Sequence, residues 1–219
     1  MPAQSPLPER QHRDLGLIET MLWTRDSGVA LLPLHLARLS RSAAALGIPV
    51  MIDAVVGAIE AAVAKSPNDR LRLRLVVKAD GSRALAVTPE PVMPEGVVWR
   101  VVVAGRRLDP ADPLIRHKTT ARRHYDEARA VATAGGADEA LFLNGAGEVC
   151  EGAITSVFVA RDGMLLTPAL DCGLLPGVLR ESLVSSGRAR EARLRLADLG
   201  AGFYLGNAVR GLFRARLAG

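Results

Sequence analysis

The sequence predicts an α/β protein of two lobes with mixed sheets, and three observations lead to this prediction. First, 49% of the 219 residues are hydrophobic and 23% are charged, so the chain can bury a substantial core. Second, segments with helical periodicity alternate with segments typical of strands. Third, the stretch GRRLDPADP (105–113) interrupts these patterns near the middle of the chain. We therefore expect an N-terminal lobe at 1–105, a linker at 106–113 and a C-terminal lobe at 114–219.

The N-terminal lobe should contain two helices and one sheet. Helices are expected over 34–47 and 51–65, each with an apolar stripe at helical spacing, and Gly47 is a natural stop for the first. The first dozen residues are expected to form a loose tail. The strands of this lobe are expected at residues 17–23, 29–32, 71–77, 83–88 and 97–103.

The C-terminal lobe should build a second sheet with two further helices. One helix is expected over 119–134. A shorter one is expected over 177–187, where Pro176 introduces it and Gly187 ends it. The strands are expected at residues 139–144, 154–160, 164–167, 189–194, 203–206 and 212–217.

The charge of the chain favours a solvated basic surface over a nucleic-acid-binding one. Lys and Arg number 28 and Asp and Glu 23, which gives a net charge of +5. The arginines are interleaved with acids, and aromatic residues make up only 4% of the chain, few for a surface that stacks on bases. We therefore expect no nucleic acid, although a basic field would attract a small anionic substrate.

The cysteines and the hydropathy exclude further classes of protein. Cys150 and Cys172 make neither a disulfide framework nor a metal-ligand pattern, so we expect a reducing, cytoplasmic environment and no metal. No stretch approaches the roughly 18 apolar residues of a membrane span. The first residues lack the apolar core of a signal peptide, and we expect no membrane attachment.

Lys118 is the first candidate catalytic residue. Only three of the 28 basic residues are lysines (Lys65, Lys78 and Lys118), and Lys118 lies in RHKTTARRHY, directly after the expected linker. A lysine amine can lose its proton and form a Schiff base, whereas a guanidinium effectively cannot. The neighbouring arginines would help to lower its pKa. The alternative is a surface lysine at a helix start.

Four further features fit the binding of a cofactor, and the first three also have an ordinary structural explanation. Glu151 lies at a strand edge and fits a pyridine nitrogen, unless it is a solvated turn carboxylate. Pro176–Gly177 precedes a helix whose first N–H groups form an anion site, unless this is only a helix start. Arg38 offers a bidentate fork for phosphate, unless it is solvated. The small residues of YLGNAVRG (204–211) permit close approach of a ligand.

The order of these motifs gives them their meaning. The series HLARL, HKTTARRHY, EGAITSVFV, CGLLPGVLR and GNAVRG closely resembles the fold-type IV enzymes that use pyridoxal 5′-phosphate (PLP), the class IV aminotransferase family. The resemblance covers about residues 17–217. It implies a two-lobed, D-amino acid aminotransferase-like fold and a homodimer. Within the family, the motifs are most similar to those of aminodeoxychorismate lyases, which make 4-aminobenzoate and pyruvate for folate biosynthesis.

The resemblance also implies a role for each site residue. Lys118 would bind PLP covalently and shuttle protons, and Glu151 would pair with the pyridine nitrogen. Leu175 would pack on the ring, with Tyr125 near its phenolic oxygen, and Arg210 is a candidate for a substrate carboxylate. The phosphate would be bound by Arg38, Asn207 and the backbone of Val178, Leu179 and Ala208.

Two positions depart from the commonest pattern of the family. Ser156 stands where many members have asparagine, and Leu179 stands where aminotransferases often have a threonine that contacts the phosphate. The second departure favours a lyase over an aminotransferase acting on D- or branched-chain amino acids, which is the main alternative. A non-catalytic basic binding domain is the third possibility.

Overall fold

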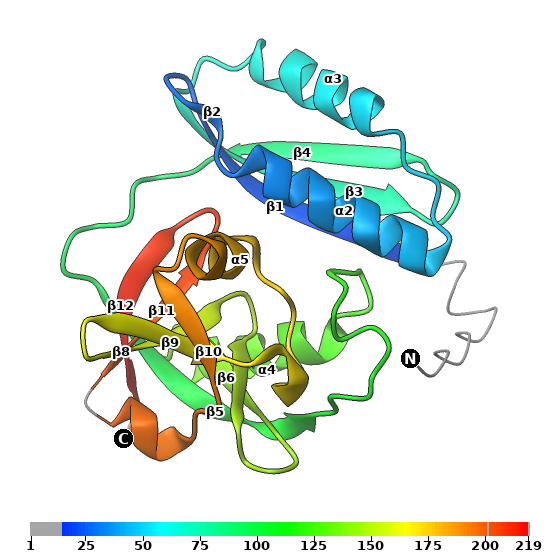
Figure 1. Cartoon of the computed structure of the whole chain (residues 1–219). Coiled ribbons are helices and arrows are strands. Elements are labelled where there is room, and N and C mark those ends of the chain that lie inside the picture. Colours follow the sequence, from blue (N-terminus) through cyan, green and yellow to red (C-terminus); the bar gives the residue numbers. More distant parts are fainter. Residues whose placement is uncertain (1–14, 201, 219) are drawn as a thin grey trace. The chain divides into compact units, whose positions relative to one another are not determined.

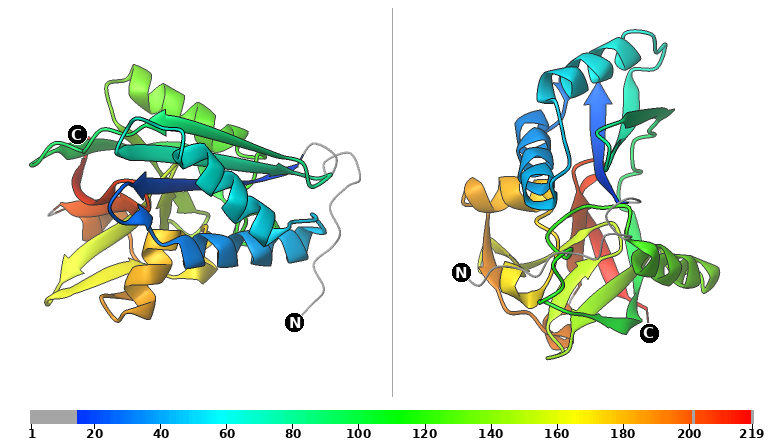
Figure 2. Two further views of the ribbon diagram at one scale, coloured as in Figure 1. Left: turned by 90° about the horizontal axis from the view of Figure 1, so that it is seen from above. Right: turned by 90° about the vertical axis from the view of Figure 1, so that its right-hand side faces the viewer.

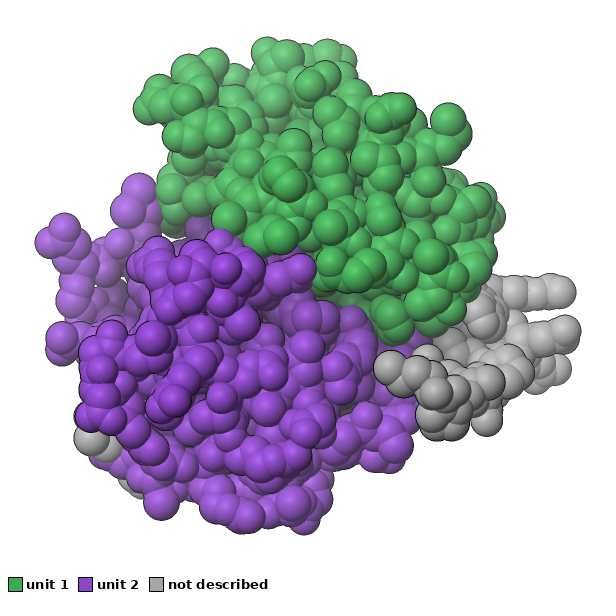
Figure 3. Space-filling view, viewed as in Figure 1, with its two compact units in different colours: residues 1–91, 117–121 green, residues 92–116, 122–219 purple. Residues whose placement is uncertain are grey.

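The computed structural model describes residues 15–200 and 202–218, and its fold is α/β, as predicted, with one antiparallel and one mixed sheet (Figure 1). The chain divides into two compact units. Unit 1 comprises residues up to Pro91 together with His117–Ala121, and unit 2 comprises Val92–Arg116 and Arg122 onwards (Figure 3). The predicted N-terminal tail lies outside the described residues. In the described ranges, no helix is long and apolar enough to cross a membrane.

Unit 1 is an antiparallel four-stranded sheet with two helices on one face (Figure 2). The strand order is β2-β1-β3-β4, and β3 alternates so that Leu71, Leu73, Leu75 and Val77 are buried. The elements are β1 (Gly16–Thr24), β2 (Gly28–Val29), α2 (Leu32–Leu46), α3 (Ile52–Val63), β3 (Arg70–Lys78) and β4 (Arg83–Pro89).

One prediction in unit 1 was wrong. Residues 29–32 were expected to form a strand, but β2 ends at Val29 and α2 begins at Leu32. Leu31 adopts the left-handed conformation (φ 55°) and starts the helix, and Pro33 occupies its first turn. Proline favours this position because its fixed φ suits a helix start and its missing N–H has no helical partner there. The predicted helix stop at Gly47 is confirmed, with φ 64°.

Unit 2 is built on an eight-stranded mixed sheet in the order β10-β9-β8-β11-β12-β5-β6-β7. Helix α4 packs on β5 and β6, and α5 packs on β10 and β11. The elements are β5 (Val98–Leu108), α4 (Arg123–Ala134), β6 (Glu139–Asn144), β7 (Val149–Gly152), β8 (Ser156–Arg161), β9 (Met164–Pro168), η1 (Leu170–Cys172), α5 (Val178–Ser185), β10 (Ala189–Ala192), η2 (Leu196–Leu199), β11 (Phe203–Asn207) and β12 (Gly211–Leu217).

The region around the predicted linker differs from expectation. The chain enters unit 2 at Val92, before the lobe boundary expected at residue 105, and β5 pairs with β12 and β6 of the second sheet. Residues 106–108 of the expected linker are strand. The β5–β6 register shifts between Val103 and Arg107, so Gly105 lies in a local irregularity that the strand tolerates. Gly105 and the charged residues after it therefore mark an irregularity within β5 and not the end of the strand.

Helix α4 begins at Arg123 and not at residue 119 as predicted. The backbone of the preceding residues is already paired with β1. Ile18 N–H donates to the Lys118 carbonyl (2.7 Å) and Thr120 N–H donates to the Gly16 carbonyl (2.8 Å). Residues in this extended antiparallel pairing do not have the φ and ψ angles of a helix, so α4 begins after them.

Candidate cofactor site

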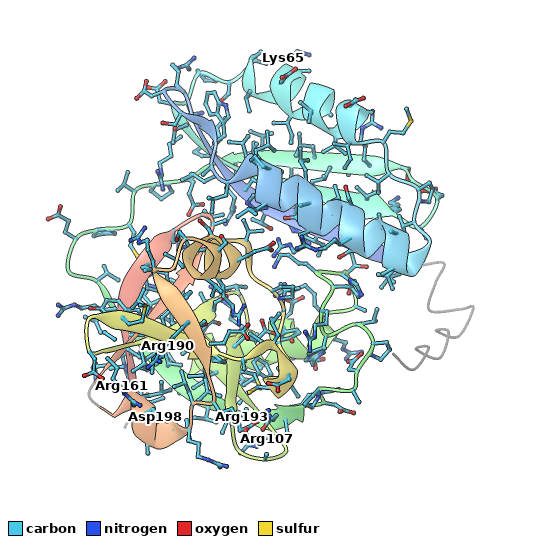
Figure 4. The ribbon with its side chains drawn as sticks, in the orientation of Figure 1. Lys65, Arg107, Arg161, Arg190, Arg193 and Asp198 are labelled. Carbon is cyan, nitrogen blue, oxygen red and sulfur yellow. The ribbon has the colours of Figure 1, made fainter. Side chains whose placement is uncertain are left out.

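Lys118 is anchored in unit 1 by the residues that follow it. Thr119 forms an isolated antiparallel bridge with Leu17, and the Thr120 hydroxyl accepts a hydrogen bond from Gly16 N–H (2.8 Å). The side chain of Lys118 is half-buried, whereas Lys65 and Lys78 are exposed. Lys65 lies just beyond α3, at the surface of unit 1 (Figure 4). Among the three lysines, Lys118 therefore has the most restricted surroundings.

Arg38 belongs to a buried ion cluster that sequence reasoning did not find. The guanidinium donates from Nε to Glu19 Oε1 (2.9 Å) and from Nη2 to Glu19 Oε2 (2.6 Å). His35 Nδ1 also lies 2.6 Å from Glu19 Oε2. Burial raises the pKa of Glu19, but Arg38 and His35 outweigh it and hold that pKa below its ordinary value. The carboxylate therefore fixes the orientation of Arg38.

His117 links the lysine segment to helix α2 inside unit 1. Its Nδ1 lies 2.9 Å from the hydroxyl of the buried Ser42, one helical turn after Arg38. Burial lowers the pKa of His117, which favours the neutral ring. The residue before Lys118 is thus fixed by the same helix that carries Arg38.

In unit 2, the buried Glu151 pairs with the half-buried Tyr125. Glu151 lies on β7 and is 7% exposed, and the Tyr125 hydroxyl, on α4, donates to its Oε1 (2.7 Å). Burial and the Glu151 charge raise the pKa of Tyr125, so the phenol stays protonated. Tyr125 also packs against Phe142, with ring centroids 4.9 Å apart. The structure therefore brings together two predicted site residues that are distant in sequence.

The start of α5 lies directly against β8. Gly177 is its N-cap, and no side chain in the described part of the chain caps the helix. A Cβ placed on Gly177 would lie 2.5 Å from Ser156 Oγ, so only glycine allows this approach. The first N–H groups of the helix, at Val178 and Leu179, carry the partial positive charge of a helix N-terminus beside that hydroxyl.

The turn between β11 and β12 also lies beside the start of α5. Asn207 Oδ1 accepts from the N–H groups of Val209 and Arg210 (3.0 Å each), and its Nδ2 donates to the Ile154 carbonyl (3.2 Å). A Cβ on Gly206 would lie 2.8 Å from Leu179 Cδ2. The structure therefore brings together β8, the start of α5 and the 207–210 turn.

Two further predicted site residues, Leu175 and Arg210, have surroundings that do not bear on the roles predicted for them. Leu175 is half-buried in the segment before Pro176. The Arg210 guanidinium lies over the Trp99 ring, 5.7 Å from its centroid, which is an ordinary cation–π contact. The suggested role of Arg210 toward a substrate carboxylate stays a prediction.

These features fit PLP, the cofactor that the sequence resemblance implies. The buried Glu151 carboxylate suits a protonated pyridine nitrogen, and a helix N-terminus without a side-chain cap, backed by Ser156, suits a phosphate. The sequence analysis did not single out Glu19 and Glu139, which are buried in unit 1 and unit 2 respectively. A charged residue inside an otherwise apolar strand, as in LIETMLW and EALFLN, was the available signal.

Comparison with known proteins gives the same assignment. A Mesorhizobium loti structure described as an amino-acid aminotransferase is 40% identical, covers 94% of this chain and 100% of its own, and superposes with a TM-score of 0.89. A Schizosaccharomyces pombe protein named as an aminodeoxychorismate lyase is 29% identical over 80% of this chain and 76% of its own length. A Thermotoga maritima protein named as a branched-chain-amino-acid aminotransferase is 28% identical over 72% of this chain, which spans only 58% of that relative.

The family model for class IV amino-transferases matches residues 16–218, nearly the whole chain. Together with the fold and the grouped motifs, this match means that the chain belongs to the class IV aminotransferase family, whose enzymes depend on PLP.

Proposed function

We propose that this protein is a PLP-dependent lyase that converts 4-amino-4-deoxychorismate to 4-aminobenzoate and pyruvate, a step of folate biosynthesis. The observation that carries the cofactor chemistry is the buried Glu151 carboxylate, paired with Tyr125 at 2.7 Å on the same unit as the uncapped start of α5. One observation favours the lyase. Leu179 packs its side chain toward Gly206 and supplies no hydroxyl for the phosphate.

The roles of the residues follow from their chemistry. When bound, PLP supplies an electron-accepting ring next to the carbon that carries the substrate's amino group. Lys118 would hold the cofactor through its Nζ amine, and the same amine, once displaced by the substrate's amino group, would move the proton of that carbon. Glu151 keeps the pyridine nitrogen protonated, and Tyr125, which donates its hydroxyl proton to Glu151, lies near the cofactor's phenolic oxygen.

Other residues bind and orient the cofactor. Arg38 binds the phosphate by its guanidinium, which Glu19 holds in a fixed orientation. Asn207 and the N–H groups of Val178, Leu179 and Ala208 complete the phosphate site, and Leu175 packs on the ring. The net charge of +5 attracts the anionic substrate, and Arg210 binds one of its carboxylates.

Transamination of an amino acid is the second candidate, because the 40% identical Mesorhizobium structure is described as an amino-acid aminotransferase. The two reactions separate in one experiment. A lyase releases 4-aminobenzoate, measured by fluorescence, and pyruvate in equal amounts from 4-amino-4-deoxychorismate with no keto acid added. Accumulation of the pyridoxamine form with D-alanine or leucine, without 4-aminobenzoate, would replace the lyase by the transaminase.

We also propose that the enzyme works as a homodimer in the cytoplasm. The family resemblance supports the dimer, and twofold dimers are the commonest assembly of soluble proteins. The two buried cysteines are free thiols, which suits a reducing compartment. Light scattering tests the dimer, and a monomer that is fully active at nanomolar concentration would contradict it.

A further inference from the structure

A second buried glutamate lies behind the loop that follows Glu151. Glu139 is the first residue of β6, and it is completely buried. Its Oε2 accepts hydrogen bonds from the Thr155 hydroxyl (2.9 Å) and from Ile154 N–H (3.1 Å). Its Oε1 accepts from Ala140 N–H (3.1 Å). Two of its three hydrogen bonds therefore go to the loop between β7 and β8.

This loop is closely packed on the glutamate. Gly152 N–H donates to the Thr155 carbonyl (2.8 Å), and Ala153 N–H donates to the Ala140 carbonyl (3.0 Å). A Cβ placed on Gly152 would lie 2.2 Å from Thr155 Oγ1 and 3.0 Å from Glu139 Oε2. Because Gly152 directly follows Glu151, the geometry of this loop, together with the pairing of β7 with β6, influences where the Glu151 carboxylate lies.

The charges around Glu139 indicate a specific use for it. Arg129 Nε lies 4.0 Å from Glu139 Oε1, beyond hydrogen-bond distance. Burial raises the pKa of Glu139, and the hydrogen bonds from Thr155 and Ile154 lower it only in part. A buried carboxylate with mostly neutral partners is costly compared with an apolar residue of similar size. The hydrogen bonds that it accepts from the loop are what an apolar residue would lack.

We propose that Glu139 is a positioning residue: through the Thr155 hydroxyl and Ile154 N–H it fixes the loop at residues 152–155, and thereby the Glu151 carboxylate. This inference rests on the function proposed above for Glu151. Glu139 touches neither cofactor nor substrate, and its effect reaches the cofactor through Glu151.

Replacing the hydroxyl at Thr155 tests the link without removing the buried charge. Thr155→Val should raise the Kd for pyridoxamine phosphate, which needs no bond to Lys118, by about tenfold, the effect of one such hydrogen bond. Thr155→Ser restores the hydroxyl and should stay within about twofold of the parent. Glu139→Gln retains an acceptor oxygen for the loop and should fall between the two. Glu127→Gln, an exposed carboxylate on α4, is the matched control and should change nothing.

Introducing Thr155→Val into a Glu151→Gln variant distinguishes an effect on the position of Glu151 from a general destabilisation of the protein. If Thr155 acts through Glu151, Thr155→Val should add less than about twofold there, because the positioned carboxylate is already gone. The same tenfold loss in both backgrounds, or no loss in the parent, would overturn the inference. If Glu151→Gln alone leaves the Kd unchanged, the role proposed for Glu151 is wrong, and this inference is overturned with it.

Discussion

Two buried glutamates, one in each unit, are stabilised in opposite ways. Glu19 in unit 1 lies 2.6–2.9 Å from the cationic Arg38 and 2.6 Å from His35. Glu139 in unit 2 takes its hydrogen bonds from a hydroxyl and two backbone N–H groups. Although both are almost fully buried, the pKa of Glu19 is held below its ordinary value, and burial raises the pKa of Glu139.

The difference shows that burial alone does not decide the charge of a carboxylate. In unit 1 the Glu19 carboxylate contacts the cationic Arg38, and it in turn orients this arginine, which we assign to the phosphate. Unit 2 surrounds its carboxylate with neutral donors, which hold a loop. The first arrangement is expected to be important for stability, and the second for geometry.

The largest expected effect concerns Lys118, the residue of unit 1 to which we assign a role in chemistry and not in folding. Lys118→Ala should abolish turnover and the visible absorbance of the bound cofactor, because no other side chain there can replace the amine. The unfolding midpoint should stay close to that of the parent, since the side chain is only half-buried. Lys65→Arg and Lys78→Arg are the controls. Loss of the absorbance in either control, with retention in Lys118→Arg, would show that the assignment is wrong.

Removing the carboxylate of the ion cluster should be the most destabilising of these changes. Glu19→Ala should lower the free energy of unfolding by about 3–5 kcal/mol, because it leaves the buried Arg38 without its carboxylate. Urea denaturation measures this loss. Glu127→Ala disrupts an exposed pair with Arg123 and should cost less than about 1 kcal/mol. Similar losses in both variants would mean that burial of the cluster contributes nothing.

Arg38→Ala should weaken cofactor binding by about one to two decades, since a charge-assisted bidentate contact contributes about 1.5–3 kcal/mol. The Kd for PLP, measured by titration, is the test. Arg41, on the exposed side of the same helix, is the matched control, and Arg41→Ala should bind with unchanged affinity. Equal affinities of parent and Arg38→Ala would count against Arg38 as a phosphate ligand.

The smallest expected effect is on the pH dependence of stability, where the two glutamates should differ in sign. Glu19 has a lowered pKa, so it contributes stability above its unfolded pKa, near 4.5, and this is lost as the pH falls through the folded pKa. Glu139 has a raised pKa, so stability falls as the pH rises from about 4.5 through its folded value. Glu139→Gln should remove that fall, and Glu19→Gln should remove the loss in acid. Urea denaturation at several pH values measures both slopes, and equal slopes in Glu139→Gln and parent would contradict the second.

Much of the fold could be predicted because the local patterns are strong. The strand predicted at 139–144 is confirmed as β6, and the apolar stripes of α2 and α3 were recognisable. The predictions failed where tertiary contacts override local signals. Pairing of Thr119 and Thr120 with β1 delays the start of α4, and β7, only four residues long, is stabilised by its place beside β6.

The candidate site was predictable in outline and not in its supporting residues. Ordered motifs located Lys118, Glu151 and the start of α5, because each has a local chemical signature. For Glu19 and Glu139 the only local signal is a charge in an otherwise apolar strand, which does not name their partners. Their partners, Arg38 and Thr155, lie 19 and 16 residues away in the sequence, and only the folded chain brings them within hydrogen-bond distance.

Three glycines near the candidate site restrict the family of sequences that can encode it. At Gly152, Gly177 and Gly206 even the methyl group of alanine would lie 2.2–2.8 Å from a neighbouring side-chain atom, and none of the three has a positive φ. Their constraint is therefore one of space and not of backbone conformation. Gly163 and Gly187 show the reverse, with φ of 75° and 71° and open surroundings. A saturation library should recover asparagine or aspartate at the latter two positions and glycine alone at the first three, which makes those three a fingerprint for recognising distant homologues.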